Sequence, residues 1–349
     1  MVQVVGWDIG GANLKAACVT TEGDRITDVL VASRPFEIWR GKELLAGKLK
    51  EIYSRIVKGN GPLALAVTMT AELSDAFATK REGVLFILES IHAAFPETPA
   101  YILNLSGHFV PLESAKANPL EFAAANWVAT AEWFSGKISN CLLVDTGSTT
   151  TDILPILDGR VSVSGRTDME RLASGELVFT GMLRTNLATI VPRVPIGGRS
   201  CRVASEYFAI SGDVHLILGH IREKDYDCST PDGQPPSLES ARRRLARLVC
   251  ADVEILSAAE IDEMARYVYT QQVRMVSEGM SQVLSRLPEL RNHPVVPVGA
   301  GAFLGSDASR MLGLEAIDPA AEWGSEELAV APCLASACLL AGRLRDPLK

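Results

Sequence analysis

The sequence has no excess of basic residues, since its 349 residues include 34 lysines and arginines against 42 aspartates and glutamates. The formal net charge at pH 7 is −8. Proteins that bind nucleic acids normally carry a basic face that neutralises phosphates. The composition therefore argues against a nucleic-acid partner and is typical of a cytoplasmic enzyme.

Long apolar runs are also missing, although 47% of the residues are apolar. The most apolar stretches, such as residues 126–134 and 333–341, are far shorter than the ~20 residues that a spanning helix needs. The first seven residues contain no lysine or arginine and lead directly to Asp8, unlike a signal peptide. We therefore expect no membrane partner, and we interpret the apolar excess as strands buried on both faces of a sheet.

The seven cysteines include no Cys-x-x-Cys pair and are odd in number, which predicts reduced thiols rather than a disulfide framework. Five cysteines and histidines fall close together in one segment: Cys201, His215, His220, Cys228 and Cys250. Their spacing matches no standard zinc motif. We expect His215, which stands in an apolar run, to be a core histidine, and a metal site in this segment is the less favoured alternative.

Apolar periodicity and turn residues predict two series of strands and helices. The first series is expected as strands 2–7, 14–20 and 25–33, helix 42–57, strand 63–69, helix 84–95, strand 100–104 and helix 119–134. The second series is expected as strands 141–144, 151–156 and 160–165, helix 258–287, strand 294–298, a helix from Ala300, strand 315–318 and helix 332–345. Both series begin alike, which indicates an internal duplication.

This pattern predicts an α/β fold of two duplicated domains, residues 1–137 and 138–349, with an α-rich insertion at about residues 166–257 of the second. Within the insertion, arginines 242–244 and 247 form a basic helix face. We expect this face to be solvated or paired with local acids, and recognition of an anionic substrate group is the alternative. Because the insertion is apolar, it is a candidate surface for the pairing of subunits into a homo-oligomer.

Glycine-rich turns mark the start of each half. Residues 8–15 (DIGGANLK) lie between the first two strands, and residues 145–152 (DTGSTTTD) occupy the same place in the second half. Adjacent glycines allow a tight turn whose N–H groups can bind phosphate oxygens. A third turn, residues 298–302 (VGAGA), follows a strand and opens a helix, the usual setting for a phosphate or nucleotide. The candidate binding residues of these turns are Gly10, Gly11, Asn13, Gly147, Ser148, Thr149, Asp152, Gly299 and Gly301.

The three turns resemble the first phosphate, second phosphate and adenosine motifs of the acetate and sugar kinase/Hsp70/actin superfamily. Within it, DTGSTTTD is most similar to the hydantoinase/oxoprolinase branch. Longer segments resemble a narrower family linked to tetrahydromethanopterin-dependent one-carbon metabolism, which includes the condensing enzyme of methanofuran biosynthesis. These segments are MTAELSDAF (69–77), AAANWV (123–128), RLASGELV (171–178), SEYF (205–208) and RLAR (244–247).

The resemblance implies two actin-like (ribonuclease H-like) domains that face each other across a cleft, and a transferase reaction. A diphosphate-activated aminomethylfuran methanol would react with the phenol of a γ-glutamyltyramine-type substrate. An aryl ether would form and diphosphate would leave. The expected partners are therefore small molecules, the furanmethanol diphosphate and a tyramine/glutamate conjugate.

Roles for individual residues follow from this resemblance as hypotheses. The diphosphate would be held by Lys15 and by the backbone at Gly10, Gly11, Gly147 and Ser148. Asp8 and Asp145 would position Mg²⁺, which prefers carboxylate and phosphate oxygens. Glu72 or Asp75, just after a strand, would accept the phenolic proton. An acid that merely favours the start of a helix is the alternative interpretation of both residues.

Ala12 departs from the superfamily pattern, because many of its kinases have threonine at this point. The missing hydroxyl weakens the case for ATP-dependent phosphoryl transfer, although binding of ATP stays open. The first alternative is an ATP-dependent small-molecule kinase or a hydrolase of the hydantoinase/oxoprolinase type. The second is a nucleotide-binding regulator of the one-carbon pathway that performs no turnover.

Overall fold

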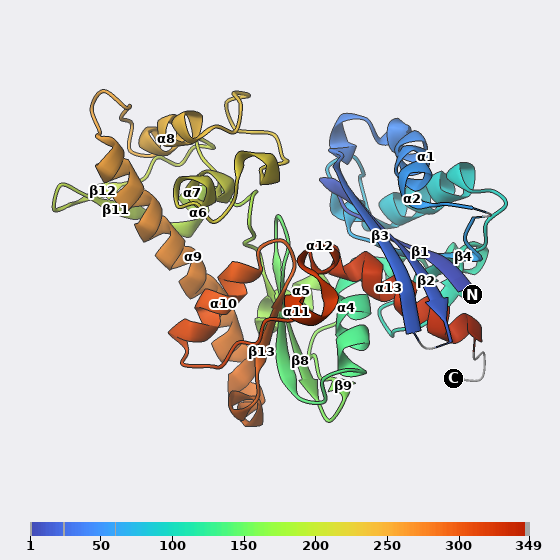
Figure 1. The fold of residues 1–349 in the computed structure, drawn as a ribbon. Helices are drawn as coiled ribbons and strands as arrows, with labels where there is room; N and C mark the ends of the chain where they lie inside the picture. Colours follow the sequence, from blue (N-terminus) through green and yellow to red (C-terminus); the bar gives the residue numbers. More distant parts are fainter. Residues whose placement is uncertain (1, 24, 60, 346–349) are drawn as a thin grey trace.

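A computed structural model describes residues 2–23, 25–59 and 61–345 of the chain. The first of its sheets has the strand order β3-β2-β1-β4-β5-β6 (Figure 1). The central strand β1 (Val2–Ile9) pairs antiparallel with β2 (Asn13–Glu22) and parallel with β4 (Ala64–Met69). The outer strands are β3 (Arg25–Pro35), β5 (Ala100–Leu103) and β6 (Phe109–Pro111).

Both faces of this first sheet are covered, because alternate side chains of a strand point to opposite faces. On one face, Val5 and Trp7 belong to a core shared with helices α1 (Leu45–Ile56) and α2 (Lys80–Ala94). On the other face, Val4 belongs to a core shared with α4 (Asn126–Ser135) and α13 (Ala331–Arg345). The predicted origin of the apolar excess, strands buried on both faces, is therefore confirmed.

The second sheet repeats the start of the first. Strand β7 (Cys141–Thr146) pairs antiparallel with β8 (Thr151–Leu157) and parallel with β13 (Val295–Val298). The short strands β9 (Arg160–Val161) and β10 (Leu177–Val178) pair with opposite ends of β8. The predicted α/β architecture of two duplicated halves is confirmed.

Three predicted elements differ from the structure. The helix expected over 119–134 is divided into the 3₁₀ turn η4 (Pro119–Phe122) and α4, because Ala124 adopts a left-handed backbone (φ 51°) that ends the first turn. The strand expected over 160–165 is only two residues long. The strand expected over 315–318 is reduced to a single bridge between Ala316 and Val295.

The insertion is built around the first part of a long helix, α9 (Ala258–Arg286), against which α7 (Ser211–Ile217) and α8 (Leu238–Arg247) pack (Figure 1). The other elements of the insertion are α5 (Asp168–Ser174), α6 (Leu187–Ile190), β11 (Arg193–Ile196), β12 (Arg199–Arg202) and the 3₁₀ turn η5 (Glu223–Asp225). A core of its own joins α6, β11, α7, α8 and the first part of α9, and it includes Val214, Leu245 and Met264. Of the strands in the insertion, only the short β10 joins a large sheet, where it pairs with β8. The strands β11 and β12 pair only with each other.

The final helices of the two halves cross over. Figure 1 shows α13 lying along β1 and β2 of the first sheet, and α4 beside the strands of the second. The approach of α13 is so close that a Cβ atom at Gly6 would lie 1.9 Å from the carbonyl oxygen of Cys333. The boundary predicted between residues 137 and 138 falls between α4 and β7, and the division into two domains at that point stays a prediction.

The remaining elements are short turns and helices at the edges of the sheets and around the cleft. They are η1 (Ile38–Arg40), η2 (Lys42–Leu44), η3 (Ala71–Leu73), α3 (Leu112–Ala115), η6 (Pro288–Asn292), α10 (Ala302–Met311), α11 (Ala320–Trp323) and α12 (Ser325–Leu328). Within the described residues, no helix combines the length and apolarity needed to cross a membrane.

Candidate functional site

A cavity of about 550 Å³ lies between the two halves. The turn after β1 and the turn after β7 face each other across it, and the side chains that line it include Asp8, Lys15, Glu72 and Asp152. The amide Nδ2 of Asn13 reaches across to within 3.5 Å of the Ser148 hydroxyl, which links the two turns directly. The structure therefore brings the first two predicted phosphate turns together into one site.

Asp8 and Lys15 are neighbours across the β1–β2 pair. Burial raises the pKa of the Asp8 carboxyl to about 6, although the nearby Lys15 ammonium acts in the opposite direction. The Oδ1 atom of Asp8 is buried and makes no hydrogen bond with the described residues. Lys15 forms no ion pair within the described chain, and its ammonium donates a 3.4 Å hydrogen bond to the carbonyl of Ala329. Both groups are therefore free to meet a ligand.

The second turn places Asp145 and Asp152 opposite each other across the β7–β8 pair. Asp152 accepts a 2.8 Å hydrogen bond from the guanidinium of Arg171, which is itself buried and stacks on Trp127 at 4.4 Å. Burial raises the pKa of Asp145 to about 7, and the charges of Asp152 and Asp8 add to this rise. Asp145 does not line the cavity but lies behind it.

The backbone amides of the turns differ in what they can offer a phosphate. The Gly10 amide donates to the carbonyl of Asn13 (3.0 Å) and the Gly147 amide to that of Thr150 (2.9 Å), so both bonds close the turns themselves. These two amides are therefore engaged within their own turns, and the predicted contact of Gly10 and Gly147 with a diphosphate stays a prediction. No backbone carbonyl of the described chain accepts from the amides of Gly11 or Ser148, which remain available.

The third glycine turn does not reach the cavity. The Gly299 amide donates to the carbonyl of Leu328, and the Gly301 amide to that of Thr146. A Cβ atom at Gly299 would lie 2.4 Å from the Thr146 carbonyl oxygen. These glycines therefore serve the close packing of the turn against the end of β7, and their predicted contact with a nucleotide stays a prediction.

Glu72 and Asp75 both line the cavity, but their environments differ. Asp75 is exposed, whereas Glu72, in the turn η3 that follows β4, is 1% exposed. Neither oxygen of Glu72 makes a hydrogen bond of good geometry with the described residues. Burial raises the pKa of Glu72 to about 7, and the weak effects of nearby backbone amides and Lys80 only partly oppose it. Burial thus distinguishes Glu72 from Asp75, and the choice of either residue as the base stays a prediction.

The lining residues that had no predicted role include Arg171, Arg184 and Trp39. Arg171 stood in a segment that resembled a known family, but nothing in its spacing indicated a partner for Asp152. Arg184 and Trp39 are far apart in sequence, yet the guanidinium of Arg184 stacks on the Trp39 ring at 4.7 Å. No sequence signal could have found this pair, because it depends on how the two halves meet.

The other predicted candidates have structural roles. The expected pairing of the basic helix face with local acids is confirmed, since Arg242 pairs with Asp262, and Arg244 and Arg247 both pair with Asp232. These arginines are therefore not free to recognise an anionic substrate group. His215 is fully buried beside His220, as expected for a core histidine. No group of three or more metal-binding side chains occurs in the part of the chain that is described.

Comparisons with known proteins show which proteins this chain resembles. The sequence profile of the hydantoinase/oxoprolinase family matches residues 64–342. A Methanocaldococcus jannaschii protein is 36% identical over 308 residues, 88% of each chain, and is named (4-{4-[2-(gamma-L-glutamylamino)ethyl]phenoxymethyl}furan-2-yl)methanamine synthase. A Methanococcus vannielii protein of the same name is 40% identical over 179 residues, which are 51% of this chain and 79% of that one.

A solved structure shares the fold. The nucleotide-free structure of acetone carboxylase superposes with a TM-score of 0.51 at 11% identity, covering 96% of this chain and 70% of that one. At this identity the likeness concerns the fold alone.

Proposed function

The chain belongs to the hydantoinase/oxoprolinase family, and on this premise we propose that it is a synthase of methanofuran biosynthesis that joins a furan to a phenol. The observation that carries the proposal is the 36% identity to the Methanocaldococcus jannaschii synthase over 88% of both chains. The substrates are a diphosphate-activated aminomethylfuran methanol and a γ-glutamyltyramine-type phenol. The class of the reaction is therefore a transferase reaction that releases diphosphate.

In the reaction, the phenolic oxygen forms a bond to the furan methylene carbon while the bond from that carbon to the diphosphate oxygen breaks. The electron pair of the broken bond leaves with the diphosphate, and the phenolic proton goes to a base. A phenol has a pKa near 10, so removal of its proton accelerates attack. The site must therefore stabilise a departing anion and hold an unprotonated base.

The departing diphosphate is held by Lys15, the Gly11 and Ser148 amides, and the Asn13 amide group. Support comes from the free Lys15 ammonium in the cavity and from two backbone N–H groups without acceptors in the described chain. These fixed donors stabilise charge as it develops on the leaving group. Thr149 adds a hydroxyl at the same turn.

A magnesium ion fits the acidic side of the cavity. The buried Oδ1 of Asp8 has no hydrogen-bond partner in the described chain. Asp145 is near enough to Asp8 for the charge of Asp8 to raise the pKa of Asp145. Magnesium is usually held by one or two carboxylates together with phosphate oxygens. When bound, the ion would neutralise negative charge on the diphosphate.

Glu72 is the base in this proposal. Its pKa of about 7 leaves a large fraction ionised at neutral pH, and its oxygens have no competing hydrogen bonds of good geometry. The exposed Asp75 lacks this environment. Closure of the two halves around the cavity excludes water, which would otherwise compete with the phenol for the activated furan.

The experiment incubates the purified protein with Mg²⁺, the furanmethanol diphosphate and γ-glutamyltyramine, and measures the ether by mass spectrometry and diphosphate by a coupled assay. Parallel reactions contain ATP with candidate acceptors and are assayed for ADP. Diphosphate release that requires the phenol supports the synthase. Formation of ADP instead supports a kinase or hydrolase, and binding without turnover of either mixture supports a regulator.

A matched pair of lysine variants locates the diphosphate. Lys15→Ala should reduce kcat/KM at least 100-fold, because a charged hydrogen bond to the leaving group is lost. Lys50→Ala removes an exposed lysine of α1 and should leave the rate within about twofold of wild type. Equal rates for the two variants would contradict the proposal that Lys15 binds the diphosphate.

A further inference from the structure

A second cavity, of about 350 Å³, adjoins the first, and the two share Ala12 and Arg184 in their linings. Its charged side chains are three cations and two carboxylates: Arg40, Lys48, Arg184, Glu37 and Asp227. The charged side chains of a cavity beside a reaction site can bind charged groups of a substrate. The question is which of these charges have partners inside the protein.

Two of the three cations are already paired. Arg40 donates to Glu37 at 2.8 Å, and Lys48 donates to Glu51 at 3.0 Å. Arg184 makes no ion pair within the described chain, and its buried Nη1 atom has no hydrogen-bond acceptor there. A buried donor without a partner is costly, so a ligand atom is the natural acceptor.

The position of Arg184 is fixed from both sides. Its backbone amide donates to the Ser148 carbonyl at 3.0 Å, so the residue is attached to the second glycine turn. Its guanidinium stacks on Trp39 at 4.7 Å. Trp39 is attached in turn to the first glycine turn, because its neighbour Ile38 donates to the Gly11 carbonyl at 3.0 Å. The free guanidinium thus stands where the two cavities and the two turns meet.

Asp227 supplies the complementary free charge. No cation of the described chain lies within ion-pair distance of its carboxylate. Burial raises its pKa, and the charge on Lys15 only partly opposes this rise. Arg184 and Asp227 therefore line the same cavity, with opposite charges and without pairing to each other.

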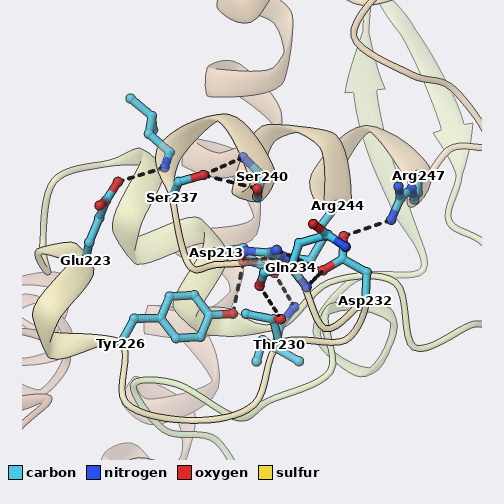
Figure 2. A network of polar contacts seen from close by, with 12 residues as sticks. Asp213, Glu223, Tyr226, Thr230, Asp232, Gln234, Ser237, Ser240, Arg244 and Arg247 are labelled. Carbon is cyan, nitrogen blue, oxygen red and sulfur yellow. Dashed lines mark hydrogen bonds and ion pairs between the residues drawn. The ribbon is translucent and has the colours of Figure 1, made fainter.

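The loop that carries Asp227 is held by the polar network of Figure 2. The hydroxyl of Tyr226 donates to Asp213 at 3.0 Å, and Arg244 donates to the same carboxylate at 2.7 Å. Farther along the loop, Asp232 accepts from Arg244 at 3.0 Å and from Arg247 at 3.1 Å. Because the loop is fastened on both sides of Asp227, this carboxylate has a defined position at the cavity.

A γ-glutamyl group matches these two charges. The γ-glutamyl unit in the printed name of the relatives uses its side-chain carboxyl in the amide, which leaves an α-carboxylate and an α-amine that are both attached to the α-carbon. We propose that the second cavity binds this α-amino-acid end of the phenolic substrate, with Arg184 receiving the α-carboxylate and Asp227 the α-ammonium group. This inference rests on the proposed function and names the substrate end that the site recognises.

The arrangement also orders the substrate. With the amino-acid end in the second cavity, the chain of the substrate passes Arg184 and Trp39 into the first cavity. The phenol then enters the space that Glu72 and the two glycine turns line. Recognition of the γ-glutamyl group and positioning of the phenol are thus parts of one binding event.

Binding is measured by titration calorimetry with three synthetic phenols. They are γ-glutamyltyramine, 4-aminobutanoyl-tyramine, which lacks the α-carboxylate, and glutaryl-tyramine, which lacks the α-amine. We expect the wild-type protein to bind γ-glutamyltyramine about 10- to 100-fold more tightly than either analogue, since each loses one charged hydrogen-bonded contact. Equal affinity for all three phenols would overturn the proposal without use of any variant.

Two variants assign the contacts. In Arg184→Gln the preference for γ-glutamyltyramine over 4-aminobutanoyl-tyramine should fall to about one, while the preference over glutaryl-tyramine persists. In Asp227→Asn the pattern should be reversed. The matched control Arg199→Gln, on the exposed strand β12, should keep both preferences. Loss of both preferences in either variant, or of neither, contradicts the assignment.

The binding test separates this inference from the proposed function. Charge-dependent binding of γ-glutamyltyramine without ether formation would retain the cavity assignment and reject the synthase. Ether formation with equal efficiency from all three phenols would retain the synthase and reject the cavity assignment. Thermal melting of each variant establishes that the compared proteins are folded.

Discussion

At the scale of single residues, the duplicated hairpins carry opposite charges at corresponding positions. Lys15 faces Asp8 in the first hairpin, and Asp152 faces Asp145 in the second. Asp152 is neutralised by Arg171 at 2.8 Å, whereas Lys15 has no ionic partner in the described chain. The first hairpin therefore brings an ammonium group without an ionic partner to the cavity. The second hairpin carries carboxylates instead.

The pH dependence of turnover should reveal Glu72. The base must be ionised, so kcat should rise with pH through about 7, where Glu72 loses its proton. Glu72→Gln should lower kcat by about 100- to 10,000-fold and remove this acidic limb. Steady-state rates between pH 5 and 9 measure both effects. Asp75→Asn is the matched control. If the acidic limb persisted in Glu72→Gln but disappeared in Asp75→Asn, the base would be Asp75 and not Glu72.

The same carboxyl should influence stability. Its pKa rises from 4.5 to about 7 on folding, so the folded state binds the proton more tightly. The stabilisation from the neutral form is complete below pH 4.5 and is lost as the pH rises through about 7. The glutamine of Glu72→Gln cannot ionise. Between pH 4 and pH 8 the free energy of unfolding of this variant should therefore rise by about 3 kcal/mol relative to that of the wild type. Urea unfolding at both pH values measures this, and a difference that does not change with pH contradicts it.

At the scale of elements, a helix fixes the position of this base. Gly83 of α2 lies so close to η3 that a Cβ atom would stand 2.6 Å from the Cα atom of Glu72. By contrast, a Cβ atom at Gly47 of α1 would meet no atom within 4 Å. Substitution by alanine should therefore have opposite effects on stability at these two helical glycines.

Gly47→Ala should stabilise the protein by about 0.5–1 kcal/mol, because alanine loses less backbone entropy in a helix. Gly83→Ala should destabilise it by about 1–3 kcal/mol, since the clash with the backbone of Glu72 outweighs that gain. Gly83→Ala should also lower kcat by displacing Glu72, although no ionisable group is removed. Thermal melting and rate measurements on both variants check this, and stabilisation by Gly83→Ala would contradict the packing.

The elements also show what a sequence can indicate about such a site. The turns after β1 and β7 were predictable, because an acidic residue followed closely by glycine between two apolar strands carries a local signal. The break at Ala124 was not, since alanine favours helix and its left-handed backbone is imposed by the surrounding fold. The contact of Arg184 with Trp39, and the packing of Gly299 on Thr146, depend on pairings between distant segments, which no local pattern contains.

At the scale of the whole molecule, the first sheet is completed by the distant helix α13. Val4, Ala17 and Ala66 of that sheet share a core with Leu334 and Ala337 of α13. A fragment of residues 1–137 would keep α4 but lack α13, and would therefore expose part of one apolar face of its sheet.

We expect this fragment to show no cooperative urea transition, and a version extended by residues 331–345 through a flexible linker to regain one. Circular dichroism during urea titration measures both. A sharp transition in the shorter fragment would mean that residues 1–137 fold as an independent domain.

The crossing of α13 also has a consequence for synthesis in the cell. Residues 1–137 leave the ribosome long before α13, which begins at Ala331. At about 5–20 residues per second, some 10 to 40 seconds pass before that helix emerges. During this interval the nascent first sheet presents a partly uncovered apolar face, which is a natural target for a chaperone that binds growing chains. The fold thus ties completion of its earliest sheet to one of its latest helices.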